Sequence, residues 1–407
     1  MIRSLTTARP GAPGDAEPGA RTLRACMFTA ESQKGHARYT RDLMTALAGA
    51  GPARGVEVSL VTSRDLAEPY RSSRYPIEAI LPPLVDRRRF KNRLSWGVSR
   101  LAHYVGRERA FLRWVASQPD LGLIHFQEYT PWLAPTHFPR LRRRGLALVE
   151  TVHNIANYGH ASRSYMQLSR RCWQSAWRSC SGLIVHTEGL RDALSDFLGP
   201  KHPPLFVTPH AVWEERTRPP TQARLTPGEP PRLLFFGVIR PNKGLHVLLR
   251  AMEFLPECVL TVAGEPVYGD YLDEVRALAA RLPAGRVELD ARFIRESEIE
   301  GVFDRSQLVA LPYTEFASQS GVLHQALAHG RPVVASDVGG LGESVKAWGI
   351  GEVVVPDDPR ALAEAVRKAL EPARYEAAAN HLSAARADLT WTKMAEATLD
   401  VYRAVAD

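Results

Sequence analysis

The stretch Leu311–Glu343, LPYTEFASQSGVLHQALAHGRPVVASDVGGLGE, carries the strongest chemical pattern of the chain. We expect an apolar strand to end at Pro312, a loop of small and polar residues to follow, and a helix to begin near Gly321. The first turn of a helix presents unpaired backbone N–H groups and the positive end of the helix dipole, which favour an anion. The pattern therefore predicts a phosphate-binding loop.

The elements that must position this loop alternate along the chain. Short apolar runs bounded by turn residues, such as Leu23–Ala30, Leu146–His153 and Arg232–Gly237, are separated by helical patterns such as Tyr39–Ala48. Strands that are apolar on both faces fit the middle of a parallel sheet covered by helices. The fold class predicted is α/β with two doubly wound, Rossmann-like sheets, in which functional residues follow the carboxyl ends of strands.

A proline-rich stretch divides the chain into two such units. We expect a disordered leader, an N-terminal Rossmann-like domain, a linker, a C-terminal Rossmann-like domain and a last helix that docks back on the N-terminal domain. Their expected bounds are 1–20, 21–213, 214–230, 231–385 and 386–407, respectively.

Charge divides at the same place. The chain carries a net charge of +8. Residues 1–212 hold 30 basic and 16 acidic side chains, which leaves a net charge of −6 on the rest. The basic half fits an anionic partner, or reflects only an abundance of arginine. Within it, residues 86–118 form a basic amphipathic pattern that indicates either a membrane-surface helix or a packed helix with a solvated outer face.

The composition excludes several classes of protein. No stretch approaches about 18 consecutive apolar residues, so no membrane-spanning helix is expected. The four cysteines form no Cys-x-x-Cys pair, which argues against a disulfide framework or a zinc site. No export signal is visible at the N-terminus, so we expect a cytoplasmic protein, with peripheral contact at the inner face of the membrane as an option.

Several segments together resemble the retaining glycosyltransferases of family 4, which have the GT-B fold. The segments are HGRPVVASDVGGL, RLLFFGVIRPNKGLHVLLRA, VETVHN, GLIVHTEGLRDAL and VTPHAVW, and they occur in the family's order across residues 23–370. The resemblance implies transfer of a sugar from a nucleoside diphosphate to an acceptor hydroxyl in a cleft between two domains. It makes residues 21–213 the acceptor-side domain and residues 231–385 the nucleotide-sugar-binding domain. It also implies that the departing phosphate helps to deprotonate the acceptor, so that no dedicated base is needed.

The chain departs from the family where two glutamates are usual. Ala317 and Gln325 occupy those positions. Gln325 can still bond ribose hydroxyls, since its amide offers donors and an acceptor. Ala317 cannot replace its counterpart, so Gln319, Ser320 or backbone groups must contact the sugar.

The resemblance assigns the leaving-group charge to Arg240 and Lys243, because fixed cations stabilise a departing diphosphate. His153, at a strand end, is expected beside the transferred sugar and completes the catalytic set. Further residues are expected to bind the donor: Gly35, Gly237, Gly264, Glu265, Ile294, Ser318, Gln319, Ser320, Gly321, Val322 and Gln325. Weaker acceptor-side candidates are His36, Arg38 and Asn154.

No Asp-x-Asp motif that could hold a metal-bound diphosphate is present, so we expect neither a metal nor another cofactor. The predicted partners are a nucleotide-sugar donor and a saccharide, lipid-linked or small-molecule acceptor. Two alternatives remain: a noncatalytic nucleotide-sugar-binding or activator subunit, and nucleic-acid binding, against which the absence of any known nucleic-acid module argues.

Overall fold

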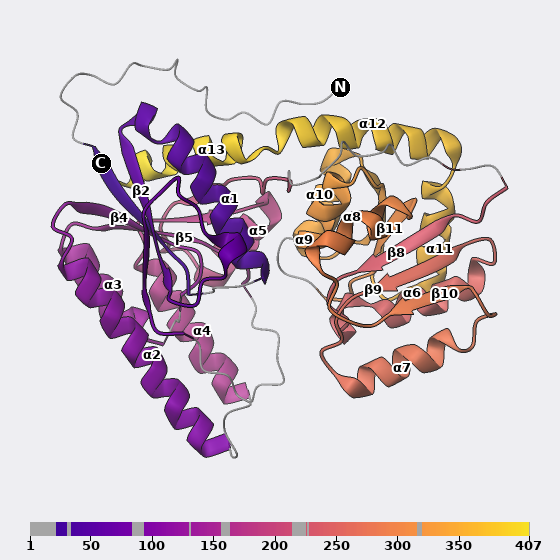
Figure 1. Ribbon diagram of the computed structural model, residues 1–407, viewed down its shortest axis with the longest axis horizontal. Helices are drawn as coiled ribbons and strands as arrows, with labels where there is room; N and C mark the ends of the chain where they lie inside the picture. Colours follow the sequence, from indigo (N-terminus) through magenta and orange to yellow (C-terminus); the bar gives the residue numbers. More distant parts are fainter. Residues whose placement is uncertain are drawn as a thin grey trace.

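The computed structural model describes residues 22–30, 34–83, 93–129, 132–155, 163–213, 225, 228–315 and 320–406, without the side chains of 34–35, 93–98 and 163–166. Two lobes lie side by side, and the last two helices run along one edge of both (Figure 1).

The N-terminal lobe is built on a seven-stranded sheet in the order β3-β2-β1-β4-β5-β6-β7, with every pair parallel. Its strands are β1 Leu23–Phe28, β2 Val56–Ser63, β3 Ile77–Leu81, β4 Leu121–Phe126, β5 Ala147–Thr151, β6 Gly182–Val185 and β7 Leu205–Val207. Its helices are α1 Lys34–Ala50, α2 Arg93–Ala116, α3 Ala134–Arg143, α4 Arg163–Arg178 and α5 Glu188–Leu198.

The C-terminal lobe has a six-stranded parallel sheet in the order β10-β9-β8-β11-β12-β13. Its strands are β8 Arg232–Phe236, β9 Val259–Ala263, β10 Val287–Asp290, β11 Leu308–Leu311, β12 Val333–Ser336 and β13 Gly351–Val354. The helices are α6 Leu245–Ala251, α7 Gly269–Ala279, α8 Glu296–Asp304, α9 Gly321–Ala328, α10 Gly339–Trp348, α11 Pro359–Ala369, α12 Pro372–Asp388 and α13 Trp391–Ala406.

The central strands are buried on both faces, as their apolar composition predicts. All five residues of β5 are buried, and so are all four of β11 and β12. Local signals begin the helices: the Asp358 carboxylate accepts hydrogen bonds of 3.0 Å from two backbone N–H groups of α11, and Pro359 is its first residue. The predicted doubly wound α/β class is confirmed.

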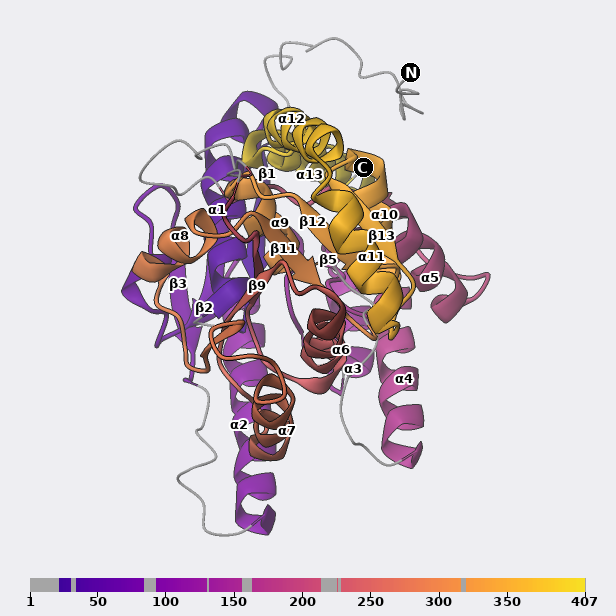
Figure 2. The same cartoon turned by 90° about the vertical axis from the view of Figure 1, so that its right-hand side faces the viewer.

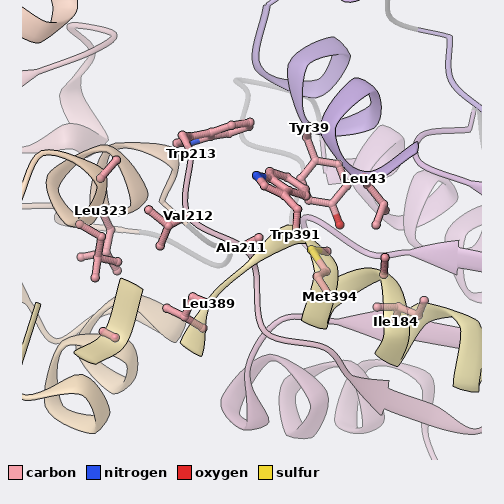
Figure 3. Close-up of a cluster of buried hydrophobic side chains, with 14 of the residues drawn as sticks. Tyr39, Leu43, Ile184, Ala211, Val212, Trp213, Leu323, Leu389, Trp391 and Met394 are labelled. Atoms are coloured by element: carbon pink, nitrogen blue, oxygen red, sulfur yellow. The ribbon is translucent and has the colours of Figure 1, made fainter. Parts of the chain in front are cut away.

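A buried hydrophobic cluster joins the two lobes. Trp391, at the start of α13, lies 5.6 Å from the ring of Tyr39 on α1 and 5.5 Å from that of Trp213, centroid to centroid (Figure 3). The Val212 N–H donates to the carbonyl of Leu389 over 2.8 Å, so the chain crosses between the lobes twice at one place. Seen from the side, α12 and α13 lie together at the top of the molecule (Figure 2), and α13 packs against α1, β4 and β5 of the N-terminal lobe.

The start of the first helix differs from expectation. The sequence pattern begins the first helix at Tyr39, whereas α1 begins at Lys34 and takes Gly35, a predicted donor-binding residue, into its first turn. One glycine costs a helix only about 1 kcal/mol, which the buried residues further along α1, such as Leu43, easily offset.

Candidate functional site

Each sheet has a point where the strand order reverses, between β1 and β4 in the N-terminal lobe and between β8 and β11 in the C-terminal lobe. Loops that leave neighbouring strands in opposite directions open a crevice at such a point. The described residues that follow these strands include Gln127 and Glu128 after β4, Arg240 after β8 and Tyr313 after β11. The candidate site is therefore set by topology.

Gly237 and Gly264 shape the backbone on the donor side. Gly237 ends β8 with φ +103°, a conformation that L side chains rarely adopt, and a Cβ there would lie 3.2 Å from Val322 of α9. A Cβ on Gly264 would lie 1.6 Å from the Gly237 carbonyl oxygen. The ends of β8 and β9 thus approach so closely that glycine is needed, and this brings the loop after β8 against the first turn of α9.

Arg240 precedes a short 3-10 turn, Pro241–Lys243, and Lys243 ends that turn, one residue before α6. The Lys243 ammonium lies 3.6 Å from the ring centroid of Tyr313. The Tyr313 hydroxyl and the Ser320 hydroxyl are 2.9 Å apart, and Ser320 caps α9 by accepting from the Leu323 N–H. These contacts place the ammonium beside the positive end of α9.

The two cations differ in their electrostatics. The buried Nε of Arg240 has no hydrogen-bond partner in the described part of the chain. Burial, and then the neighbouring charge of Arg240, lowers the pKa of Lys243 to about 7. An anion placed between them would satisfy the guanidinium and return the ammonium to its charged form.

His153 follows β5 and is held by Gln127 across the adjacent strand end. Its Nε2 lies 3.0 Å from the Gln127 Oε1, and since a carbonyl oxygen only accepts, Nε2 carries the proton and Nδ1 is left as an acceptor. The Gln127 amide donates onward to His125 over 3.3 Å, and His125 Nδ1 lies 2.8 Å from the hydroxyl of Tyr402 on α13. A chain of hydrogen bonds thus fixes the ring of His153.

Histidines crowd the centre of the molecule and stay neutral there. The ring of His210 lies 4.1 Å from that of His324 on α9, across the two lobes, and His186 lies 5.3 Å from His210. Burial lowers the pKa of His186 to about 4 and that of His125 and His324 to about 3. For His153, burial and then the charge of His36 lower the pKa well below its usual range, so that a neutral ring faces the site.

A cavity of about 410 Å³ connects the lobes at this point. Its lining residues from the N-terminal lobe are His36, Tyr39, Gln127, Glu128, Tyr129, Glu150, Thr151, Val152, His153, Asn154, Ile155, Trp173, Trp177, His210 and Trp213, and Gly321 lines it from α9. The cavity thus brings together predicted residues of both sides, His36, His153, Asn154 and Gly321. Gln127, Glu128 and Glu150 were not among the predicted site residues, although their places at or near strand ends are a signal that could have found them.

Other predicted residues lie elsewhere or have a second role. Arg38 stacks over Trp213 at 4.6 Å and pairs with Glu296 of α8 at 3.8 Å, so it bridges the lobes. The Ser320 hydroxyl is occupied as a helix cap. Glu265 is exposed after β9 and Ile294 is buried after β10, while Gln325 is half-buried on α9. Ser318 and Gln319 lie outside the described residues, as do Ala317 and the leader.

The basic segment 86–118 is described only from Arg93, where α2 begins. Its carboxyl-terminal half packs into the core through Phe111 and Val115, whereas Leu101 is 64% exposed beside Arg100. Figure 1 shows this helix extending away from the sheet. In the described residues, no helix is both long and apolar enough to cross a bilayer. Contact of this segment with a membrane surface stays a prediction.

Two family models match the chain along most of its length. "Glycosyltransferase Family 4" matches residues 34–216, and "Glycosyl transferases group 1" matches residues 230–372. The chain belongs to the family 4 glycosyltransferases. The division between the two models falls within the proline-rich stretch between the lobes.

Curated relatives of this family 4 chain are glycosyltransferases of several kinds. A glycogen synthase of Mycobacterium tuberculosis is 29% identical over 307 residues, covering 72% of this chain and 67% of the relative. A D-inositol 3-phosphate glycosyltransferase of Nocardioides is 34% identical over 212 residues, covering 47% of this chain and 46% of the relative.

Solved structures share the whole fold. A sucrose-phosphate synthase from Thermosynechococcus elongatus superposes with a TM-score of 0.71 at 22% identity, covering 94% of this chain and 98% of that one. Anabaena HepE in complex with UDP gives a TM-score of 0.67 at 18% identity, covering 94% of this chain and 100% of that one. The predicted GT-B fold is confirmed.

Proposed function

We propose that this chain is a retaining, metal-independent glycosyltransferase that moves a sugar from a nucleoside diphosphate to an acceptor hydroxyl. The observation that carries the proposal is the meeting of three positive groups: Arg240, Lys243 and the first turn of α9. Gly321, the first residue of that helix, also lines the cavity.

The proposed mechanism follows from that charge distribution. Cleavage of the bond between the anomeric carbon and the phosphate leaves negative charge on the diphosphate. Arg240 and Lys243 stabilise that charge, and the low pKa of Lys243 in the free protein means that donor binding takes up a proton there. These cations take the place of a divalent metal, and the departing phosphate receives the acceptor proton.

His153 is proposed to position the sugar and not to act as a base. Its fixed Nε2–H is used by Gln127, and its Nδ1 is available to accept from a sugar hydroxyl. Gln325 and the backbone of α9 are proposed to hold the ribose and phosphates of the donor, with Ser318 and Gln319 near its sugar. Anabaena HepE was solved with UDP-glucose, which supports a uridine donor as the first to test.

Nucleotide binding and product analysis test the proposal. Isothermal titration with UDP, GDP, ADP and their sugars, with and without a chelator, should reveal one tight nucleotide whose affinity does not depend on metal. Arg240→Ala should weaken that affinity at least tenfold, which is about 1.4 kcal/mol, while Arg250→Ala on the exposed face of α6 should not.

Product stereochemistry tests the retaining mechanism. The anomeric configuration of the product, read by proton NMR, should equal that of the donor. An inverted product would reject the front-face mechanism. Donor binding without turnover on any acceptor would instead favour the noncatalytic subunit.

A further inference from the structure

The acceptor side of the cavity has an unusual composition for a basic lobe. Two carboxyl groups, Glu150 and Glu128, line it together with the indoles of Trp173 and Trp177. No lysine or arginine stands among the lining residues in the described part of the chain. The surplus positive charge of residues 1–212 is therefore not what the cavity presents to a ligand.

Glu150 is the group that most needs a ligand. It lies on β5, facing the same side of the sheet as Leu148 and Val152, and is only 3% exposed. Its Oε2 has no hydrogen-bond partner of good geometry among the described residues, and the indole N–H of Trp177, which also lacks such a partner, lies near the carboxyl group. A buried carboxylate oxygen without a partner costs several kcal/mol, so this position is poorly explained by folding alone.

The surroundings of Glu150 disfavour a negative ligand. Burial raises the pKa of Glu150 to about 8, the nearby Trp177 N–H lowers it, and the charge of Glu128 raises it further. The two carboxyl groups therefore lie close enough to repel each other. A phosphate would add to that repulsion, whereas a cation beside Glu150 would favour the ionised form of its carboxyl group.

We propose that this part of the cavity binds a protonated amine of the acceptor, held by Glu150 and Glu128 beside the indoles of Trp173 and Trp177. An ammonium group supplies up to three N–H donors and a full positive charge, and aromatic faces attract cations. The inference deepens the proposed function, on which it rests for the identity of the ligand as the acceptor.

The geometry also accounts for the rigidity such a pocket requires. The two indole rings are packed 4.8 Å apart on α4, and Trp177 is 1% exposed. Tyr129 also lines the cavity, and its hydroxyl donates to the carboxyl of Glu108 on α2. The amine pocket is thus built on β4, β5 and packed helices, which keep the carboxyl group of Glu150 in place.

The test is a binding experiment that needs no donor. Tryptophan fluorescence of the full chain is titrated with glucosamine, with N-acetylglucosamine as the neutral probe and glucose 6-phosphate as the anionic one. We expect glucosamine to bind at least tenfold more tightly than either. Glu150→Gln, which keeps the shape and removes the charge, should abolish that preference, and Glu128→Gln should reduce it.

Glu376→Gln, on the exposed face of α12, is the matched control and should retain the preference. Equal affinities, a preference for the neutral or the anionic probe, no glucosamine binding, or an unchanged preference in Glu150→Gln would each overturn the inference. Failure of the proposed function would show separately, as absence of nucleotide binding that depends on Arg240. The two failures are therefore distinguishable.

Discussion

Replacing Glu150 by glutamine should stabilise the protein in a pH-dependent way. The folded chain raises the pKa of this carboxyl from 4.5 to about 8, chiefly by burial. A carboxyl group with a raised pKa keeps its proton in the folded state at pH values at which the unfolded chain has lost it. The contribution of Glu150 to stability is therefore full below pH 4.5 and is lost as pH rises through the window from 4.5 to about 8.

The size of the effect follows from the shift. At roughly 1.4 kcal/mol per pKa unit, the loss of folding stability caused by the raised pKa of Glu150 grows to about 3 kcal/mol at pH 7. Glu150→Gln removes the ionisation and keeps the volume, so the variant should exceed the wild type by that amount at pH 7. At pH 5 the wild-type carboxyl is protonated and the two proteins should agree within about 1 kcal/mol.

Urea denaturation at pH 5, 7 and 8, followed by circular dichroism, measures the difference directly. Glu376→Gln serves as the control, because the carboxyl group of Glu376 is exposed to solvent in the folded chain. A variant that is less stable than the wild type at pH 7, or a difference that stays constant from pH 5 to pH 8, would refute the reasoning. Substitutions at ligand-binding positions commonly raise stability while they reduce function.

Two further predictions concern the fold around the site. Gly264→Ala should lower the free energy of unfolding by about 3 kcal/mol or more in urea denaturation, because its Cβ would meet the Gly237 carbonyl oxygen at 1.6 Å. The control is Gly269→Ala, which should be neutral or stabilising because a Cβ there meets nothing within 4 Å. Equal effects of the two substitutions would argue against the close approach of Gly264 to Gly237. Because buried His125, His186 and His324 have lowered pKa values, the unfolded chain binds more protons below pH 6.5. His153 and His210, whose pKa values are also lowered, act in the same direction. Stability of the Glu150→Gln variant should therefore fall by at least roughly 3 kcal/mol between pH 6.5 and 5, after allowing for the opposing effect of a raised acid such as Glu108, and a flat profile would contradict this.

The sequence alone determined the architecture. Strands that are apolar on both faces and are separated by helical patterns fit parallel sheets with helices on each side. The structure has two such sheets. The sequence also singled out the loop before Gly321 and the cations after β8, because strand ends followed by helix starts are where such sheets bind ligands. Two short strands at or beside a sheet edge, β3 and β7, lack that pattern and were not identified, since edge strands need not be apolar on both faces.

Only the tertiary structure decided which residues meet. Gln127 follows β4 and Glu150 lies on the neighbouring strand β5, 23 positions later in the chain, and no spacing rule connects them to Trp177 on a later helix. The pairing of His210 with His324 likewise depends on how the lobes pack. Local patterns fix elements because they depend on nearby residues, whereas the charge and shape of a cavity depend on which elements become neighbours. Composition therefore predicted a basic lobe, and only the packing of its elements shows that the pocket within it is acidic.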